Sequence, residues 1–212
     1  MAAENMARRT IEKGGAILRI GALHIHPSAI FLPALIYFLN AGYFVLLTAI
    51  AVLVHELGHY ALLRLWGGEV KRIKLWIGGV SMVYGGLGYA GEAVTALMGP
   101  GASLSLALVS ALFGRVFSYV PAYHLAGLSM LLAIFNMLPV FPLDGGRAMF
   151  SIIAKVLGLP AAERVRRICN LAFTGVLGVL GAAMLWLSGN PTVLITAVFL
   201  ALGAARSGEN GV

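Results

Sequence analysis

The apolar run from Pro27 to Leu63 constrains the fold of this chain more than any other feature of its sequence. One helix crosses a bilayer with ~20 apolar residues, so the run is too long for a single span. The best turn signal within it is Asn40-Ala41-Gly42. We therefore predict a short first membrane span at about 27–40 and a second at about 43–65.

The composition agrees with a membrane protein. The 212 residues are 60% hydrophobic and 11% charged, whereas soluble domains are about 45–50% apolar and about 25% charged. Further apolar runs predict four more spans, and the predicted fold is therefore an all-α multi-pass membrane protein with six transmembrane helices. These four runs are Glu92–Leu112, Tyr123–Leu138, Ile168–Leu187 and Thr192–Ala205.

Two segments between the spans have other patterns. Residues 69–91 partly alternate apolar and polar side chains and are rich in glycine, which predicts a small membrane-associated β-hairpin or extended loop after the second span. Pro139 and Pro142 break the fourth span, and a short amphipathic helix is expected from Arg147 to about Leu157.

Basic residues predict the orientation in the membrane. Lysine and arginine gather in residues 1–26 and in the segments after the second span and before the fifth, while the opposite loops offer only Arg115. By the positive-inside rule, both termini are expected in the cytoplasm of a cell-membrane protein. The net charge of +7 is then a property of the loops and does not indicate a nucleic-acid partner.

The chain is expected to form a single integral-membrane domain, residues 1–212. Within it, residues 1–26 are a cytoplasmic or interfacial segment, 27–147 the catalytic core and 148–212 the C-terminal helices. No cleavable signal peptide is recognised. The single cysteine, Cys169, excludes an internal disulfide.

A cluster of ionisable residues lies within the second span, as His55-Glu56-Leu57-Gly58-His59. Such residues are costly inside a membrane helix, so their presence needs a reason. Positions i and i+4 share one helix face, where His55 and His59 could bind one metal ion, with Glu56 beside it as a general base. The alternatives are a chance cluster or a polar contact between helices.

Catalytic zinc has three protein ligands and a water, so a third ligand is required. Asp144, the only aspartate, follows the two prolines on the same side of the membrane as the second span's metal motif. The alternative is that Asp144 caps the following helix. The other histidines are less suitable: His24 and His26 precede the first span, and His124 lies in a loop on the opposite side. Two histidines and a carboxylate suit zinc best, one per chain, but admit iron or cobalt.

The segment Asn136–Arg147, with the pattern N-x-x-P-x-x-P-L-D-G-G, and the HELGH sequence together resemble the site-2 protease family of intramembrane zinc metalloproteases. His26-Pro27 is similar to the compact bacterial and archaeal branch to which sporulation protein IV FB belongs. Gly99-Pro100 resembles the family's third-span segment, which we interpret as a kink with close packing. Ser103 stands about where the family often has asparagine.

The resemblance implies roles for seven residues. It assigns zinc binding to His55, His59 and Asp144, and the catalytic base to Glu56. It also implies that Asn136, Pro139 and Pro142 position the substrate strand. For Asn136 the alternative is a hydrogen bond between helices. The PDZ and CBS domains of larger relatives are not expected in this chain.

The expected function is that of an intramembrane zinc endopeptidase acting in regulated intramembrane proteolysis. The resemblance implies substrates that are membrane-tethered proteins or pro-proteins, with membrane regulatory proteins as further partners. Two other classes stay open: a metal transporter using the same residues as a transit site, and a pseudoprotease that binds substrates without cutting them.

Overall fold

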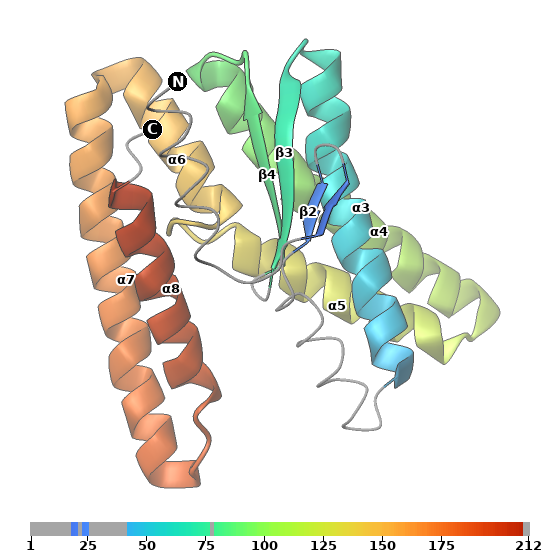
Figure 1. Ribbon diagram of the computed structural model, residues 1–212. Helices are drawn as coiled ribbons and strands as arrows, with labels where there is room; N and C mark the ends of the chain where they lie inside the picture. Colours follow the sequence, from blue (N-terminus) through green and yellow to red (C-terminus); the bar gives the residue numbers. More distant parts are fainter. Residues whose placement is uncertain (1–17, 21–22, 26–41, 77–78, 210–212) are drawn as a thin grey trace. The chain divides into compact units, whose positions relative to one another are not determined.

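The computed structural model describes residues 18–20, 23–25, 42–76 and 79–209 (Figure 1). This part of the chain is mostly helical. It divides into two compact units, one made of residues up to Ala49 together with Gly67–Gly86, the other of Ile50–Trp66 and Leu87 onwards.

The first unit contains a four-stranded sheet in the order β1-β2-β3-β4. β2 pairs with β1 antiparallel and with β3 parallel, and β3 pairs with β4 antiparallel. The strands are β1 (Leu18–Ile20), β2 (Leu23–Ile25), β3 (Glu69–Trp76) and β4 (Gly79–Gly85). The segment expected to be a hairpin or loop thus holds two antiparallel strands, and its association with the membrane stays a prediction.

β1 and β2 were not expected from the sequence. Each has three residues, in the segment that the sequence predicts only as a basic cytoplasmic or interfacial region. Strands this short carry too few residues for a visible alternation. β2 is ordered by pairing with Ile73 and Leu75 of β3, which lie far along the chain.

Six helices account for the remaining described elements. They are α3 (Gly42–Leu65), α4 (Tyr89–Phe117), α5 (Val120–Asn136), α6 (Asp144–Leu157), α7 (Leu159–Ser188) and α8 (Thr192–Glu209). α5 and α7 each carry a proline within their first two positions, where the missing N–H costs no helical hydrogen bond. α7 is followed by Gly189, whose φ of 68° suits glycine at a helix C-terminus.

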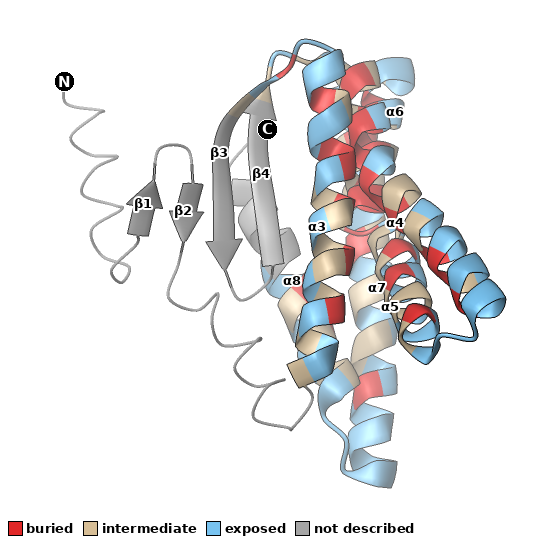
Figure 2. Ribbon diagram, turned by 90° about the vertical axis from the view of Figure 1, so that its right-hand side faces the viewer, coloured by how far each residue is buried: buried red, intermediate tan, exposed pale blue. Residues whose placement is uncertain are grey.

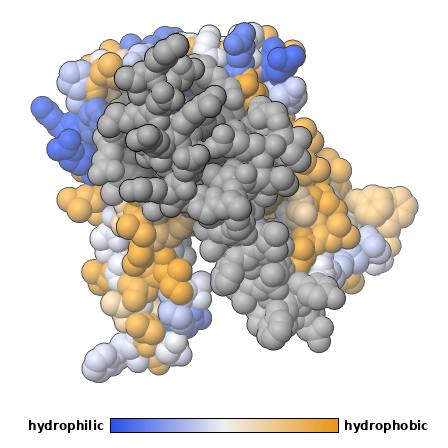
Figure 3. Space-filling view, viewed as in Figure 1, coloured by the Kyte–Doolittle hydropathy of each residue, from blue (hydrophilic) through white to orange (hydrophobic). Residues whose placement is uncertain are grey.

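In the described part of the chain, α3, α4 and α7 are long and apolar enough to cross a membrane. α5 and residues Thr192–Leu202 of α8 form shorter apolar helices. Their outward side chains are largely apolar, as Figure 3 shows along the C-terminal helices. The predicted first span at about 27–40 lies outside the described residues, so the count of six spans stays a prediction.

Small residues bring the helices of the second unit close together. Figure 2 shows buried residues along the inner faces of α4 and α6. On α4 these include Ala96, Gly99, Ser103 and Ala107. Gly58 of α3 faces this helix, and a Cβ there would lie 2.5 Å from the carbonyl oxygen of Met98. Close backbone approach through small residues is the usual packing mode of membrane helices.

α6 begins three residues earlier than the predicted Arg147 start, at Asp144. The first turn contains Gly145 and Gly146. In the fold a Cβ on Gly145 would overlap the carbonyl group of Met137, and one on Gly146 would lie 2.5 Å from the carbonyl carbon of Val140. The glycines therefore let a regular helix start against the preceding turn.

Candidate metal centre

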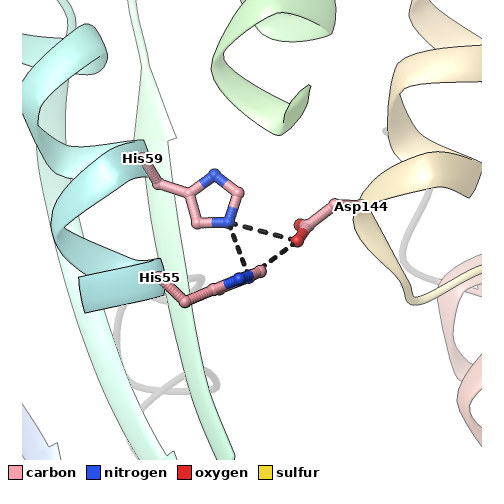
Figure 4. A group of neighbouring side chains, drawn as sticks. All are labelled: His55, His59 and Asp144. Atoms are coloured by element: carbon pink, nitrogen blue, oxygen red, sulfur yellow. Dashed lines mark hydrogen bonds and ion pairs between the residues drawn. The ribbon is translucent and has the colours of Figure 1, made fainter. Parts of the chain in front are cut away.

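Three potential ligand atoms from two helices converge in the second unit (Figure 4). Nε2 of His55 lies 3.0 Å from Oδ2 of Asp144, and Nε2 of His59 lies 3.1 Å from the same oxygen. The two Nε2 atoms are 3.2 Å apart. All three side chains are buried.

The two histidines are brought together by helical spacing and Asp144 by the fold. His55 and His59 occupy successive turns of one face of α3, with ring centroids 4.9 Å apart. Asp144 is the first residue of α6 and follows a turn that contains a cis Phe141–Pro142 peptide. The turn directs the carboxylate towards the two imidazoles (Figure 4).

Residues of α4 contact the second ring nitrogen, Nδ1, of each imidazole. His59 Nδ1 donates a hydrogen bond of 2.7 Å to the carbonyl oxygen of Thr95. His55 Nδ1 lies 2.9 Å from Oγ of Ser103. Gly99 lies between them in sequence, and a Cβ at this position would overlap the imidazole of His59.

These α4 residues were not among the site residues inferred from the sequence. Thr95, Gly99 and Ser103 follow one another at intervals of four, so they share a helix face. This four-residue spacing is the sequence signal by which the three residues could have been grouped. Gly99 had been interpreted as a packing residue at a kink, and the structure shows that what packs against it is the imidazole of His59.

The donor set fits a metal ion. With its Nδ1 proton donated to Thr95, neutral His59 presents an electron pair at Nε2, and the carboxylate of Asp144 presents another 3.1 Å away. These electron pairs repel unless a cation, either a proton on His59 or a metal ion, lies between them. Tetrahedral zinc with bonds of ~2.0–2.1 Å needs its ligand atoms roughly 3.3 Å apart, close to the separations found here.

The charge of Asp144 also suits metal binding. This residue lies outside the candidate membrane spans. Burial alone would raise the pKa of Asp144, but the neighbouring imidazoles outweigh this effect and hold that pKa below its ordinary value. Oδ1 also lies 4.0 Å from the guanidinium of Arg147, one turn along α6. The carboxylate is therefore in the charged form that ligates a metal.

Glu56 is not one of the three residues whose ligand atoms converge. It is half-buried on α3, directly after His55. Its carboxylate interacts electrostatically with His59, His55 and Asp144. Its role as the catalytic base stays a prediction.

The remaining predicted residues belong to the segment that leads to Asp144. Asn136 ends α5, and its side-chain amide donates a hydrogen bond of 3.0 Å to the carbonyl oxygen of Leu132. Pro139 is exposed and Pro142 half-buried in the turn that follows. The structure thus connects these residues to the site through the backbone, and their contact with substrate stays a prediction.

The turn before Asp144 is anchored by α7. The backbone N–H of Phe141 donates a hydrogen bond of 2.9 Å to Oδ1 of Asn170, a buried side chain. The Phe141 ring packs edge-on against Phe150 and lies 5.5 Å below the guanidinium of Arg166. The sequence signal for this anchor was a single asparagine in an apolar helix.

Comparison with known proteins identifies relatives of this chain. A match to Peptidase family M50 covers residues 113–180, which include Asp144. The chain is 29% identical over 167 residues to a zinc metalloprotease of Methanocaldococcus jannaschii, covering 76% of this chain and 48% of that protein. It is 31% identical over 166 residues to stage IV sporulation protein FB of Bacillus subtilis, covering 74% of this chain and 56% of that protein.

The chain spans about half the length of these curated relatives. A solved structure of a site-2 protease from Methanocaldococcus jannaschii shares its fold, with a TM-score of 0.71 over 90% of this chain and 94% of that one, at 23% sequence identity. The cofactor is zinc, as predicted, and both the donor set and the relatives support it. With its apolar helices and its zinc-compatible ligands, the chain is thus similar in sequence and fold to site-2 proteases, and its residues 113–180 match peptidase family M50.

Proposed function

We propose that this protein is an intramembrane zinc endopeptidase that hydrolyses peptide bonds of membrane-associated proteins or pro-proteins in regulated intramembrane proteolysis. The observation that supports it most is the convergence of His55, His59 and Asp144, whose ligand atoms lie within 3.2 Å of one another. Glu56 follows His55 directly on α3, and its carboxylate interacts electrostatically with all three residues.

The residues divide the chemistry between them. His55, His59 and Asp144 would hold the zinc ion, which when bound would supply Lewis-acid chemistry for the scissile carbonyl and the attacking water. Glu56 takes a proton from the attacking water as the water oxygen bonds to the carbonyl carbon. As the C–N bond breaks, Glu56 passes that proton to the leaving amine.

A role in holding the substrate is proposed for Asn136, Pro139 and Pro142. All three lie in the segment that leads to Asp144. Pro139 and Pro142 have no backbone N–H, and Asn136 has a side-chain oxygen in addition to the amide that bonds Leu132. The segment therefore offers carbonyl and amide groups to an extended substrate chain.

The proposed location is the cell membrane, with a single multi-pass domain and both termini in the cytoplasm. The support is the distribution of basic residues, which are concentrated on the side of the second span where His59 lies. The metal site would then be nearer the cytoplasmic face. The partners proposed are the lipid bilayer, a membrane-tethered substrate and membrane regulatory proteins, with no role for nucleic acid.

A metal transporter is less well supported. A transport route needs successive polar sites along the membrane normal. Within the described residues, His55, His59 and Asp144 form the one group of three or more metal-binding side chains that comes together. One buried site next to a carboxylate favours hydrolysis.

The test is cleavage of a membrane-tethered reporter by the purified protein in liposomes, comparing wild type with Glu56→Gln. We expect about one zinc per chain in both and cleavage by wild type alone. Glu69→Gln, the same change at an exposed glutamate of β3, is the matched control and should cleave normally. Equal cleavage by Glu56→Gln would refute the proposed mechanism, and zinc transport without cleavage by wild type would favour the transporter.

A further inference from the structure

The two histidines of the metal centre are held by chemically different groups. His59 Nδ1 meets a backbone carbonyl, that of Thr95, which can only accept a hydrogen bond. His55 Nδ1 meets the hydroxyl of Ser103, which can donate or accept. The proton of His59 is therefore fixed on Nδ1 by the main chain, whereas that of His55 depends on one side chain.

We propose that Ser103 is a positioning residue for the zinc site, which accepts the Nδ1 proton of His55 and so presents its Nε2 electron pair to the metal. The inference rests on the zinc site described above and is independent of the proteolytic step. It adds a residue of α4 to a centre whose ligands come from α3 and α6.

The environment of Ser103 supports this role. Its side chain is fully buried, at 0% exposure, where an unbonded hydroxyl is costly. The hydroxyl lies 2.9 Å from His55 Nδ1, on the side of the ring away from Asp144, which contacts Nε2. Ser103 and Asp144 therefore contact the two different ring nitrogens of His55. Together they fix the rotation of the imidazole and its tautomer.

Close packing keeps the hydroxyl within reach. Gly58 lies one turn from His55 on α3, and a Cβ there would lie 2.7 Å from Cβ of Ala102, the neighbour of Ser103. The backbones of α3 and α4 are thus as close as glycine allows. A short serine side chain spans the remaining distance to the imidazole, so the position calls for a small hydrogen-bond acceptor.

A matched control exists in α5. Ser129 is also at 0% exposure, but its hydroxyl has no hydrogen-bond partner among the residues that the structure describes. Ser103→Ala and Ser129→Ala delete the same atom at the same burial. They differ in whether that atom contacts a metal-binding histidine.

The experiment measures zinc affinity of the full chain in detergent by competition with a chelator, together with the visible absorption of the cobalt(II)-substituted protein. Ser103→Ala should weaken zinc binding by about ten- to a hundredfold, as is typical when a group supporting a metal ligand is lost, and should alter the cobalt bands. Ser129→Ala should match wild type in both measurements.

Ser103→Cys separates hydrogen bonding from loss of volume, because its slightly larger thiol fills the space of the hydroxyl but is only a weak acceptor. It should behave like Ser103→Ala. Wild-type zinc affinity and cobalt bands in Ser103→Ala would overturn the proposal. So would a loss of zinc affinity in Ser103→Ala combined with wild-type affinity in Ser103→Cys. An equal loss in Ser129→Ala would do the same. Neither measurement uses a substrate, so a failure of Glu56→Gln to abolish cleavage would count against the proteolytic mechanism and not against Ser103.

Discussion

Oδ2 of Asp144 lies 3.0 Å from Nε2 of His55, although 89 positions of sequence separate the two residues. The contact joins the first turn of α6 to the face of α3 that carries His55 and His59. Because the same oxygen lies 3.1 Å from Nε2 of His59, a single carboxylate completes the candidate set of three ligand atoms. The consequences of this arrangement can be measured.

Asp144→Asn should abolish tight zinc binding while preserving the fold. The amide has nearly the same shape as the carboxylate but no negative charge, and a neutral oxygen is a poor zinc ligand. We expect affinity to fall by more than about a hundredfold, beyond the loss typical of supporting groups. Chelator competition gives the affinity and circular dichroism reports the helix content. Zinc affinity equal to that of wild type would exclude Asp144 as a ligand.

Gly99→Ala should displace the imidazole of His59, because the new Cβ would overlap the ring. We expect weaker zinc binding and a lower melting temperature. Gly101→Ala, on the same helix, is the control, since a Cβ there meets no atom within 4 Å. Alanine at this control position should stabilise α4 by about 0.5–1 kcal/mol. Similar effects of the two substitutions on zinc binding and melting temperature would show that Gly99 is not needed to make room for the imidazole of His59.

Asn170→Leu should loosen the turn that carries Asp144. The substitution leaves the part-buried N–H of Phe141 without its acceptor, which costs at most about 1–3 kcal/mol, the value for a fully buried donor. Asn170→Asp retains an acceptor oxygen and should recover much of the stability. Thermal unfolding and reporter cleavage test both variants. If the leucine variant kept wild-type stability and cleavage, α7 would not anchor this turn.

Removal of zinc with a chelator should lower the melting temperature, since the ion no longer separates the electron pairs of His59 and Asp144. Bound zinc at a free concentration of a thousand times its Kd stabilises the folded state by about 4 kcal/mol. Zinc or cobalt should restore the melting temperature, whereas magnesium, which prefers oxygen ligands, should not. The same chelator should leave the melting temperature of Asp144→Asn unchanged. A drop of equal size in that variant would place the stabilising ion elsewhere.

Much of the helical framework could be predicted because its causes are local. Apolar runs and turn residues predicted helices in the regions now described as α3, α4, α5, α7 and α8. Boundaries were less accurate where packing decides them. α6 starts at Asp144 and not at Arg147 because Gly145 and Gly146 pack against the preceding turn.

The sequence by itself determined which atoms could share a metal: the i, i+4 spacing puts His55 and His59 on one face of any helix they form. Only the tertiary structure decided how those atoms are held. The carbonyl of Thr95, the space at Gly99, the hydroxyl of Ser103 and the anchor at Asn170 act across helix contacts. Such contacts depend on the distance and rotation between helices, which no local pattern encodes. The residue types and their spacing thus indicate which side chains could bind a metal, whereas the packing of the helices determines their geometry.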